Sequence, residues 1–132
     1  QLISNLSSSI SSNTTSISNL TNNINTRLIN TSYNLPSNNS FSTDIFSGHT
    51  YLFAITNAVY GCPVSPYALG FLGSWYDAEH KGILYLYKTN DFDNKYSLDI
   101  TASSNTKNVF SITNIYTSII STRVLLISMN AT

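Results

Sequence analysis

The chain has 132 residues, of which 42% are hydrophobic and only 9% charged, with six basic and six acidic side chains. This length suits one domain with one moderate core, and the neutral balance argues against a nucleic-acid binder, whose affinity rests on clustered Lys and Arg. The single cysteine, Cys62, excludes an intrachain disulfide and a zinc site made of several cysteines. No apolar run reaches the roughly 18 residues of a membrane span. The chain opens at Gln1 without a basic-then-apolar leader, so no targeting peptide is visible and we expect a piece of something longer.

Residues 1–32 are predicted to form a coiled-coil stalk, although Ser, Thr and Asn dominate this segment. Isoleucines recur there at intervals of seven, and two of them are followed by a leucine three residues later. This is the a/d pattern of a coiled coil over about four heptads. A lone helix of this composition would be unstable in water, because Ser, Thr and Asn are poor helix formers. The helix therefore requires partner helices, and the expected assembly residues are Ile3, Leu6, Ile10, Asn13, Ile17, Leu20 and Ile24.

The number of helices in the predicted coiled coil depends on Asn13. Ile at a with Leu at d ordinarily favours a dimer, whereas a buried polar layer fixes register and strand number at the expense of stability. The alternative is a mispaired Asn13 in a weak coil. Residues 10–15, Ile-Ser-Ser-Asn-Thr-Thr, resemble the Ile-x-x-Asn-Thr signature in stalks of trimeric autotransporter adhesins and of viral and phage fibres. The resemblance implies a parallel homotrimer in which three Asn13 side chains turn inward and hold an anion on the threefold axis.

Residues 33–40 are expected to be a linker, because Pro36 pushes the preceding residue out of the helical region. Residues 41–132 are expected to form an antiparallel β-sandwich head, since short aromatic and β-branched runs alternate there with turn residues. The expected strands cover residues 51–56, 68–76, 83–88, 96–102, 108–113 and 123–129.

Two of these expected strands are apolar on both faces. In residues 83–87, Leu84 and Leu86 point one way while the other three apolar side chains point the opposite way, and residues 124–127 are similar. One face of a small antiparallel sheet should meet solvent. A second covered face implies another sheet or a neighbouring subunit.

The stalk, the proline-containing joint and the all-β head together resemble a trimeric fibre of a virus or bacteriophage. The resemblance implies a location at the virion surface and a head that binds a host cell-surface receptor, often a glycan, with no nucleic-acid partner and no membrane insertion. One alternative is a purely structural module that trimerises or caps a longer fibre and has no ligand. Another is a bacterial trimeric adhesin, although residues 123–132 lack the membrane-anchor strands expected there.

The candidate ligand site is the segment at residues 75–81, between two expected strands. It combines aromatic surface with hydrogen-bonding and charged groups in an expected exposed loop, features that suit a sugar. The alternative is that its aromatic rings enter the core while its charges only solubilise the turn. Three of its residues could in principle hold a metal, but such a group arises easily by chance, and we expect no metal. The candidate residues are Trp75, Tyr76, Asp77, Glu79 and His80.

No catalytic pattern stands out, and we expect neither an enzyme nor a cofactor. There is no Gly-x-Ser-x-Gly motif, and the two histidines have no recognisable catalytic setting. Asp91 and Asp93 could serve glycoside chemistry or a calcium loop, but Lys95 replaces the next expected oxygen ligand, and a solvated turn is the better interpretation. Cys62 lies between Gly61 and Pro63 and is expected to be a small buried hydrophobe rather than a nucleophile.

Overall fold

The structure is a computed structural model that describes residues 1–60, 66–75, 80–104 and 106–130, except for the side chains of residues 25 and 26. This part of the chain forms an N-terminal helix followed by an all-antiparallel β domain, called the head below, whose two sheets are consistent with a β-sandwich. The elements are α1 (Leu2–Arg27), β1 (Leu28–Leu35), β2 (Ser40–Phe46), β3 (Thr50–Thr56), β4 (Pro66–Ser74), β5 (Lys81–Lys88), α2 (Phe92–Lys95), β6 (Tyr96–Ala102), β7 (Lys107–Asn114) and β8 (Ile120–Ser128).

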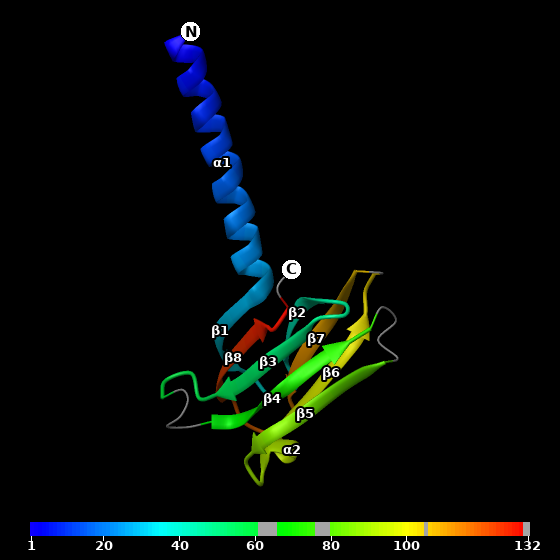
Figure 1. Cartoon of the computed structure of the whole chain (residues 1–132). Coiled ribbons are helices and arrows are strands. Elements are labelled where there is room, and N and C mark those ends of the chain that lie inside the picture. The colour runs from blue at the N-terminus through cyan, green and yellow to red at the C-terminus, as the bar shows by residue number, and fades with distance from the viewer. Residues whose placement is uncertain (61–65, 76–79, 105, 131–132) are drawn as a thin grey trace.

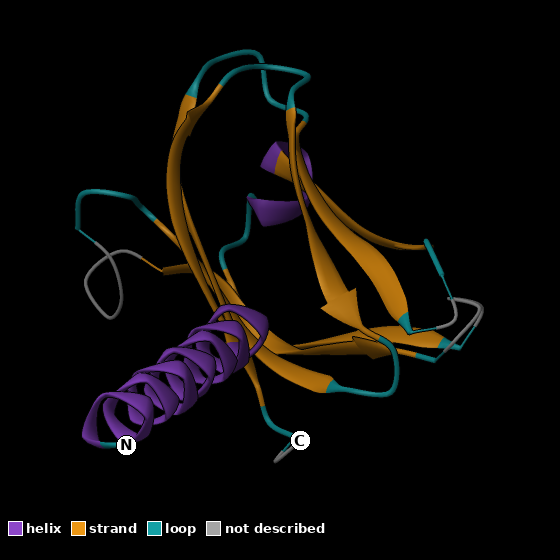
Figure 2. Ribbon diagram, turned by 90° about the horizontal axis from the view of Figure 1, so that it is seen from above, coloured by secondary structure: helices purple, strands orange, loops and turns teal. Residues whose placement is uncertain are grey.

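The head has a larger and a smaller sheet. The five-stranded sheet has the order β1-β8-β3-β4-β5, and the three-stranded sheet has the order β2-β7-β6. Figure 2 shows the two sheets as separate layers, and α1 leaves the head at one end while α2 lies at the opposite end (Figure 1). All neighbouring strands are antiparallel. Hairpins therefore join the strands that are neighbours both in the sequence and within a sheet, and the other connections pass from one sheet to the other.

The prediction of a long N-terminal helix is confirmed, but the helix has little local support. Its N-terminus has no side-chain cap and no acidic residue in the first turn, both of which usually stabilise a helix start. Its apolar stripe is exposed in the single chain, with Ile3 79% and Ile17 65% exposed. The helix extends away from the head (Figure 1), so it buries almost none of the apolar surface that most helices need for stability.

The segment after the helix differs from the prediction. Helix was expected through residue 32 and a linker over residues 33–40, but the helix ends at Arg27 and β1 follows at once. β1 pairs with β8 along its whole length, from Leu28 opposite Ile127 to Leu35 opposite Ile120. The segment does alternate, with Ile29, Thr31, Tyr33 and Leu35 separated by single polar residues. The prediction missed this pattern because it continued the helix into the segment and took Pro36 as the mark of a linker.

The other expected strands are confirmed with small shifts at their ends. β3 to β8 each overlap one of the six predicted segments, and β6 has the predicted bounds. β2 was expected only as part of the β region, without bounds. The turn expected around Asp91 and Asp93 contains a single helical turn, α2, which ends at Lys95. Strand ends are the least reliable part of such predictions, because tertiary contacts decide where pairing stops.

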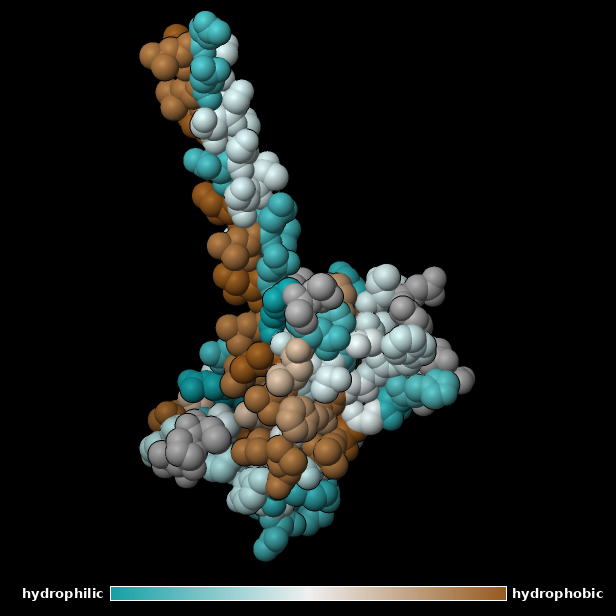
Figure 3. Space-filling view, viewed as in Figure 1, coloured by the Kyte–Doolittle hydropathy of each residue, from teal (hydrophilic) through white to brown (hydrophobic). Residues whose placement is uncertain are grey.

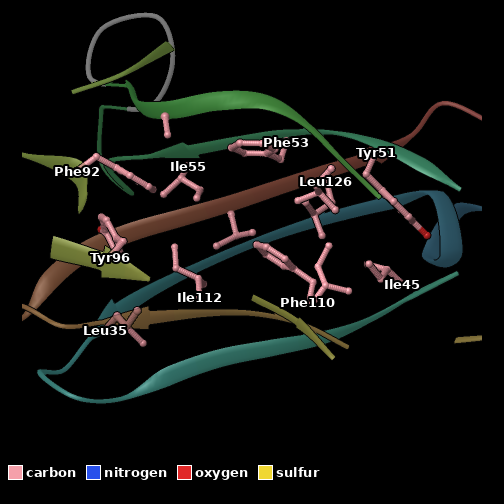
Figure 4. Packing of buried hydrophobic residues seen from close by; sticks show 14 of the residues in the cluster. Leu35, Ile45, Tyr51, Phe53, Ile55, Phe92, Tyr96, Phe110, Ile112 and Leu126 are labelled. Atoms are coloured by element: carbon pink, nitrogen blue, oxygen red, sulfur yellow. The ribbon is translucent and has the colours of Figure 1, made fainter. Parts of the chain in front are cut away.

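The core lies between the two sheets and is largely aromatic and branched. Phe53 and Leu126 from the larger sheet point toward Phe110 and Ile112 from the smaller one (Figure 4). Two buried tyrosine hydroxyls have partners, since the Tyr51 hydroxyl accepts a hydrogen bond from the Phe46 N–H and the Tyr96 hydroxyl lies 2.6 Å from Thr122 Oγ1. A buried hydroxyl without a partner would be destabilising. These hydrogen bonds therefore allow the two tyrosines to lie in the core.

The prediction that two strands are apolar on both faces is also confirmed. Ile83 and Tyr85 pack against the core from β5, while Leu84 is 61% and Leu86 59% exposed on the other face. In β8, the residues between the buried ones include Leu125 and Ile127, which are only partly buried. The outer face of the five-stranded sheet is therefore apolar.

Candidate functional site

The topology divides the loops of the head between two ends. β1 begins directly after α1, and it pairs there with the last residues of β8, which in turn lie beside the start of β3 and the end of β4. The end of β4 and the start of β5, with Trp75 and His80 next to them, therefore lie at the end of the sheet that carries the stalk. The opposite end, called the distal end below, contains α2 and the connections at residues 36–39, 57–60 and 115–119.

Trp75, from the predicted ligand segment, lies at the stalk-side end. It is 52% exposed rather than buried in the core, and its ring lies over Gly48, where a Cβ atom would come within 3.2 Å of Trp75 Cζ3. The backbone N–H of Trp75 donates to the His80 carbonyl at 2.9 Å, so the structure brings these two predicted residues together. Tyr76, Asp77 and Glu79 lie outside the described residues, as does Cys62.

A buried amide supports the backbone beside Trp75. The side-chain nitrogen of Asn108 donates to Ser74 Oγ, to Ser47 Oγ and, at 2.9 Å, to the carbonyl oxygen of Trp75. Asn108 Oδ1 is buried without a hydrogen-bond partner among the described residues. The amide connects the end of β4 to β7 and to the turn before β3. These hydrogen bonds fix the backbone that carries the Trp75 side chain.

The distal end is organised by a second buried amide, that of Asn114. Its side-chain nitrogen donates to the carbonyl of Leu35 at 2.8 Å and of Ser118 at 2.9 Å, and its oxygen accepts from the N–H of Tyr116 at 2.8 Å. Its backbone also bonds to the turn at residues 38–39, where Asn38 has a φ of 63°. Asn114 thus holds three distal segments in one arrangement. Sequence reasoning missed it, because a buried Asn at a strand end looks like any other turn residue.

Next to this amide, an aromatic ring and an ion pair reach the surface. Tyr116 is 42% exposed, and Lys95 Nζ lies 5.4 Å from the centre of its ring. Lys95 also forms a 2.8 Å ion pair with Asp91. The hydrogen bond from Lys95 is the main cause that lowers the pKa of Asp91, and the same bond raises the pKa of Lys95. A flat ring beside fixed charged groups offers the stacking and polar contacts that a sugar uses.

The two aspartates of this turn each have a lysine partner. Asp93 pairs with Lys88 at 2.8 Å, as Asp91 does with Lys95. Such pairs are weak at the surface, but they occupy the carboxylates that a calcium loop or a pair of glycosidase acids would need. The geometry therefore favours the solvated-turn interpretation for residues 90–94.

Among the described residues, no three side chains of His, Cys, Asp or Glu gather in a way that could hold a metal ion. None of the helices in those residues is long and apolar enough to cross a membrane. The chain matches no protein-family model, no curated protein and no solved structure.

Proposed function

We propose that this chain is part of a homotrimeric attachment fibre at a virion surface, in which α1 forms a parallel coiled-coil stalk and the β domain is the receptor-binding head. The observation that carries this proposal is the exposed a/d stripe of α1. Its six apolar a/d side chains are between 51% and 79% exposed in the single chain. A helix rich in Ser, Thr and Asn does not persist in water with such a stripe uncovered, so other chains must cover it.

The composition of the stripe supports copies of the same chain as the partners. The positions beside the stripe carry no Glu or Lys that could select a different helix by charge. Asn13 occupies a d position, where three copies would bring three amides to the threefold axis around an anion. At 1.5 Å per residue the 26-residue helix is about 39 Å long, enough to space the head from the particle.

The proposed ligand is a cell-surface glycan, and two surfaces of the head suit it. The sequence-based candidate is the segment with Trp75 and His80, which lies at the stalk-side end. The second candidate is Tyr116 with Lys95 at the distal end. A fibre attached to the particle by its stalk presents the distal end to the cell first, which favours Tyr116 as the contact residue.

The stalk is tested by comparing Ile17→Asn with Thr15→Asn. Both changes add the same side chain to α1, but Ile17 lies in the a/d stripe and Thr15 on the opposite side of the helix. We expect sedimentation equilibrium to give three chains per particle for the original protein and for Thr15→Asn, and one chain for Ile17→Asn, with loss of the helical circular dichroism signal. A monomeric original protein would overturn the proposal.

The ligand site is tested on trimers by binding to a glycan array. We expect Tyr116→Ala to weaken binding to the recognised glycan by on the order of tenfold or more, because a stacked ring is a typical energetic centre of such a contact. The same loss in Trp75→Ala alone would move the site to the stalk-side end.

A purely structural module is the second candidate function, and one open depression on the larger sheet favours it. A depression of about 370 Å³ on the five-stranded sheet, lined in part by Thr50, Gly73 and Gly82, is open rather than enclosed, whereas small-molecule sites are usually deep. A trimer that binds neither glycans nor cells would establish this alternative.

A further inference from the structure

The outer faces of the two sheets have opposite chemistry. The face of the three-stranded sheet that points away from the core is mostly polar, apart from Val109 and, at one end, Phe46 beside Lys107. Three rows of paired residues cross it, Ser40-Thr113-Ser97, Ser42-Ser111-Asp99 and Asp44-Val109-Thr101. This is the usual pattern for a sheet face in contact with water.

The outer face of the five-stranded sheet, called the apolar face below, has the reverse pattern. One row of apolar side chains crosses all five strands, because the register places each directly beside the next. The row is Leu28 on β1, Ile127 on β8, Leu52 on β3, Phe71 on β4 and Leu84 on β5. A second row adds Leu125, Ala54 and Leu69, with the polar Asn30 of β1 beside Leu125. A contiguous apolar surface of this extent is rare on a monomer and marks a contact site.

The apolar face continues into the stripe of the stalk. Leu28 belongs to the first row and follows α1 directly, four residues after Ile24 of the stripe. Figure 3 shows both surfaces from one side, where the hydrophobic colour runs along α1 and over the larger sheet without a polar break at the base of the helix. Whatever covers the stripe is therefore placed to cover the apolar face as well.

We infer that the apolar face is a subunit interface, at which the heads of three copies of this chain pack around the same axis as their stalks. This inference rests on the proposed trimeric stalk, since parallel helices bring three identical heads together at their base. The two apolar rows contain no charged side chain. The next row on this face, Ser32-Arg123-Thr56, carries Arg123, whose guanidinium donates to Ser32 Oγ and to the Ala58 carbonyl within the same chain.

The dimensions of the sheet suit a threefold arrangement. Strands lie about 4.8 Å apart, so five strands span about 19 Å. Three such faces set as the sides of a triangle lie about 5.5 Å from its axis, close to half of the roughly 10 Å at which sheets stack. Leucine and phenylalanine side chains of the three copies would fill that space.

The test compares Leu52→Lys with Ser111→Lys in the full chain. Leu52 lies at the centre of the apolar face and Ser111 at the centre of the polar one, each outward on a central strand. Because a buried unpaired charge opposes association, we expect Leu52→Lys to raise the concentration at which trimers dissociate by on the order of tenfold or more in sedimentation equilibrium. Ser111→Lys should leave it unchanged.

A second variant separates assembly from folding. Leu84 is 61% exposed in the single chain, so Leu84→Lys should keep the near-ultraviolet circular dichroism of the head while weakening the trimer. Trimers that resist both Leu52→Lys and Leu84→Lys, or that respond equally to Ser111→Lys, would overturn the interface and leave the fibre proposal intact, with another segment or protein on the apolar face. A monomeric original chain would overturn both proposals.

Discussion

Two buried asparagines each hold several segments of the head together through side-chain hydrogen bonds. Asn108 and Asn114 are both fully buried, and each bonds to segments from more than one strand or loop. A buried amide is most favourable when both its groups are bonded, as they are at Asn114, whereas at Asn108 the nitrogen is bonded and Oδ1 has no partner among the described residues. The loops at the two ends of the head are therefore fixed by single side chains.

Replacement of Asn114 by alanine should destabilise the head substantially. The change removes three side-chain hydrogen bonds, and it leaves the carbonyl of Leu35, in a buried bond, and that of Ser118, in a part-buried one, without that donor. We expect a loss of about 2–4 kcal/mol in the free energy of unfolding, measured by urea denaturation. Asn90→Ala, at an exposed position of a neighbouring turn, is the control and should change the value by less than about 0.5 kcal/mol. Similar losses in the two variants would contradict the role of Asn114.

The buried tyrosines predict a loss of stability in alkali. Burial is the main cause that raises the pKa of Tyr51, Tyr85 and Tyr96 above the ordinary value of 10.0. The unfolded chain therefore loses these protons at a lower pH than the folded chain does. The stabilisation is complete below pH 10.0 and is lost as the pH rises above that value toward the pKa of the folded state.

Tyr85→Phe tests this pH dependence. Phenylalanine keeps the ring that packs edge-on against Phe53 and Phe92 but removes the proton. We expect the free energy of unfolding of the variant to fall less steeply than that of the original chain between about pH 9 and about pH 11.5, as followed by urea denaturation at each pH. Parallel curves would show that burial of Tyr85 does not contribute.

At the scale of elements, the edge of the larger sheet depends on a close approach between two strands. The pairing of β4 with β5 shifts register between Leu69 and Gly70. A Cβ atom at Gly70 would lie 1.9 Å from the carbonyl oxygen of Leu84, so only glycine fits there. The exposed Leu84 and Leu86 thus owe their position to this contact.

Gly70→Ala and Gly82→Ala form a matched pair for that contact. Both glycines lie in the β4–β5 hairpin, but a Cβ at Gly82 meets nothing within 4 Å. We expect Gly70→Ala to lower the free energy of unfolding by about 2 kcal/mol or more, because the clash is with backbone, and Gly82→Ala to change it by less than about 0.5 kcal/mol. Thermal unfolding followed by circular dichroism provides the measurement. Equal melting temperatures would contradict the close approach.

At the scale of the whole molecule, the stalk and the head differ in what holds them together. The head has its own core between two sheets, whereas α1 exposes its stripe. If the helix is stable only in the trimer, dilution should melt it first. On tenfold dilution we expect the helical circular dichroism signal to melt at a lower temperature. The near-ultraviolet signal of the buried tyrosines should shift less. A helical transition that does not depend on concentration would show that α1 is stable alone.

The local sequence pattern was sufficient for the helix and for six of the strands. Heptad spacing marks α1, and alternation of apolar residues between turn residues marks β3 to β8, because both patterns record which side of a regular element is buried. The two apolar faces of β5 and β8 were also visible, since both sets of side chains lie in one short run. The candidate residue Trp75 was found by its type, and its place at the stalk-side end was not.

Pairing across long distances in the chain could only be decided by the tertiary structure. Residues 29–35 alternate between strand-favouring and polar residues, but which distant segment they pair with, β8, is not visible in the sequence. Asn114 becomes the centre of the distal end because three segments meet there. Local propensity amounts to tenths of a kcal/mol per residue, while burial and hydrogen bonds to distant segments contribute more. A periodic apolar face is therefore visible in the sequence alone, whereas the distant partner of each strand and the place where distant segments meet are decided by the fold.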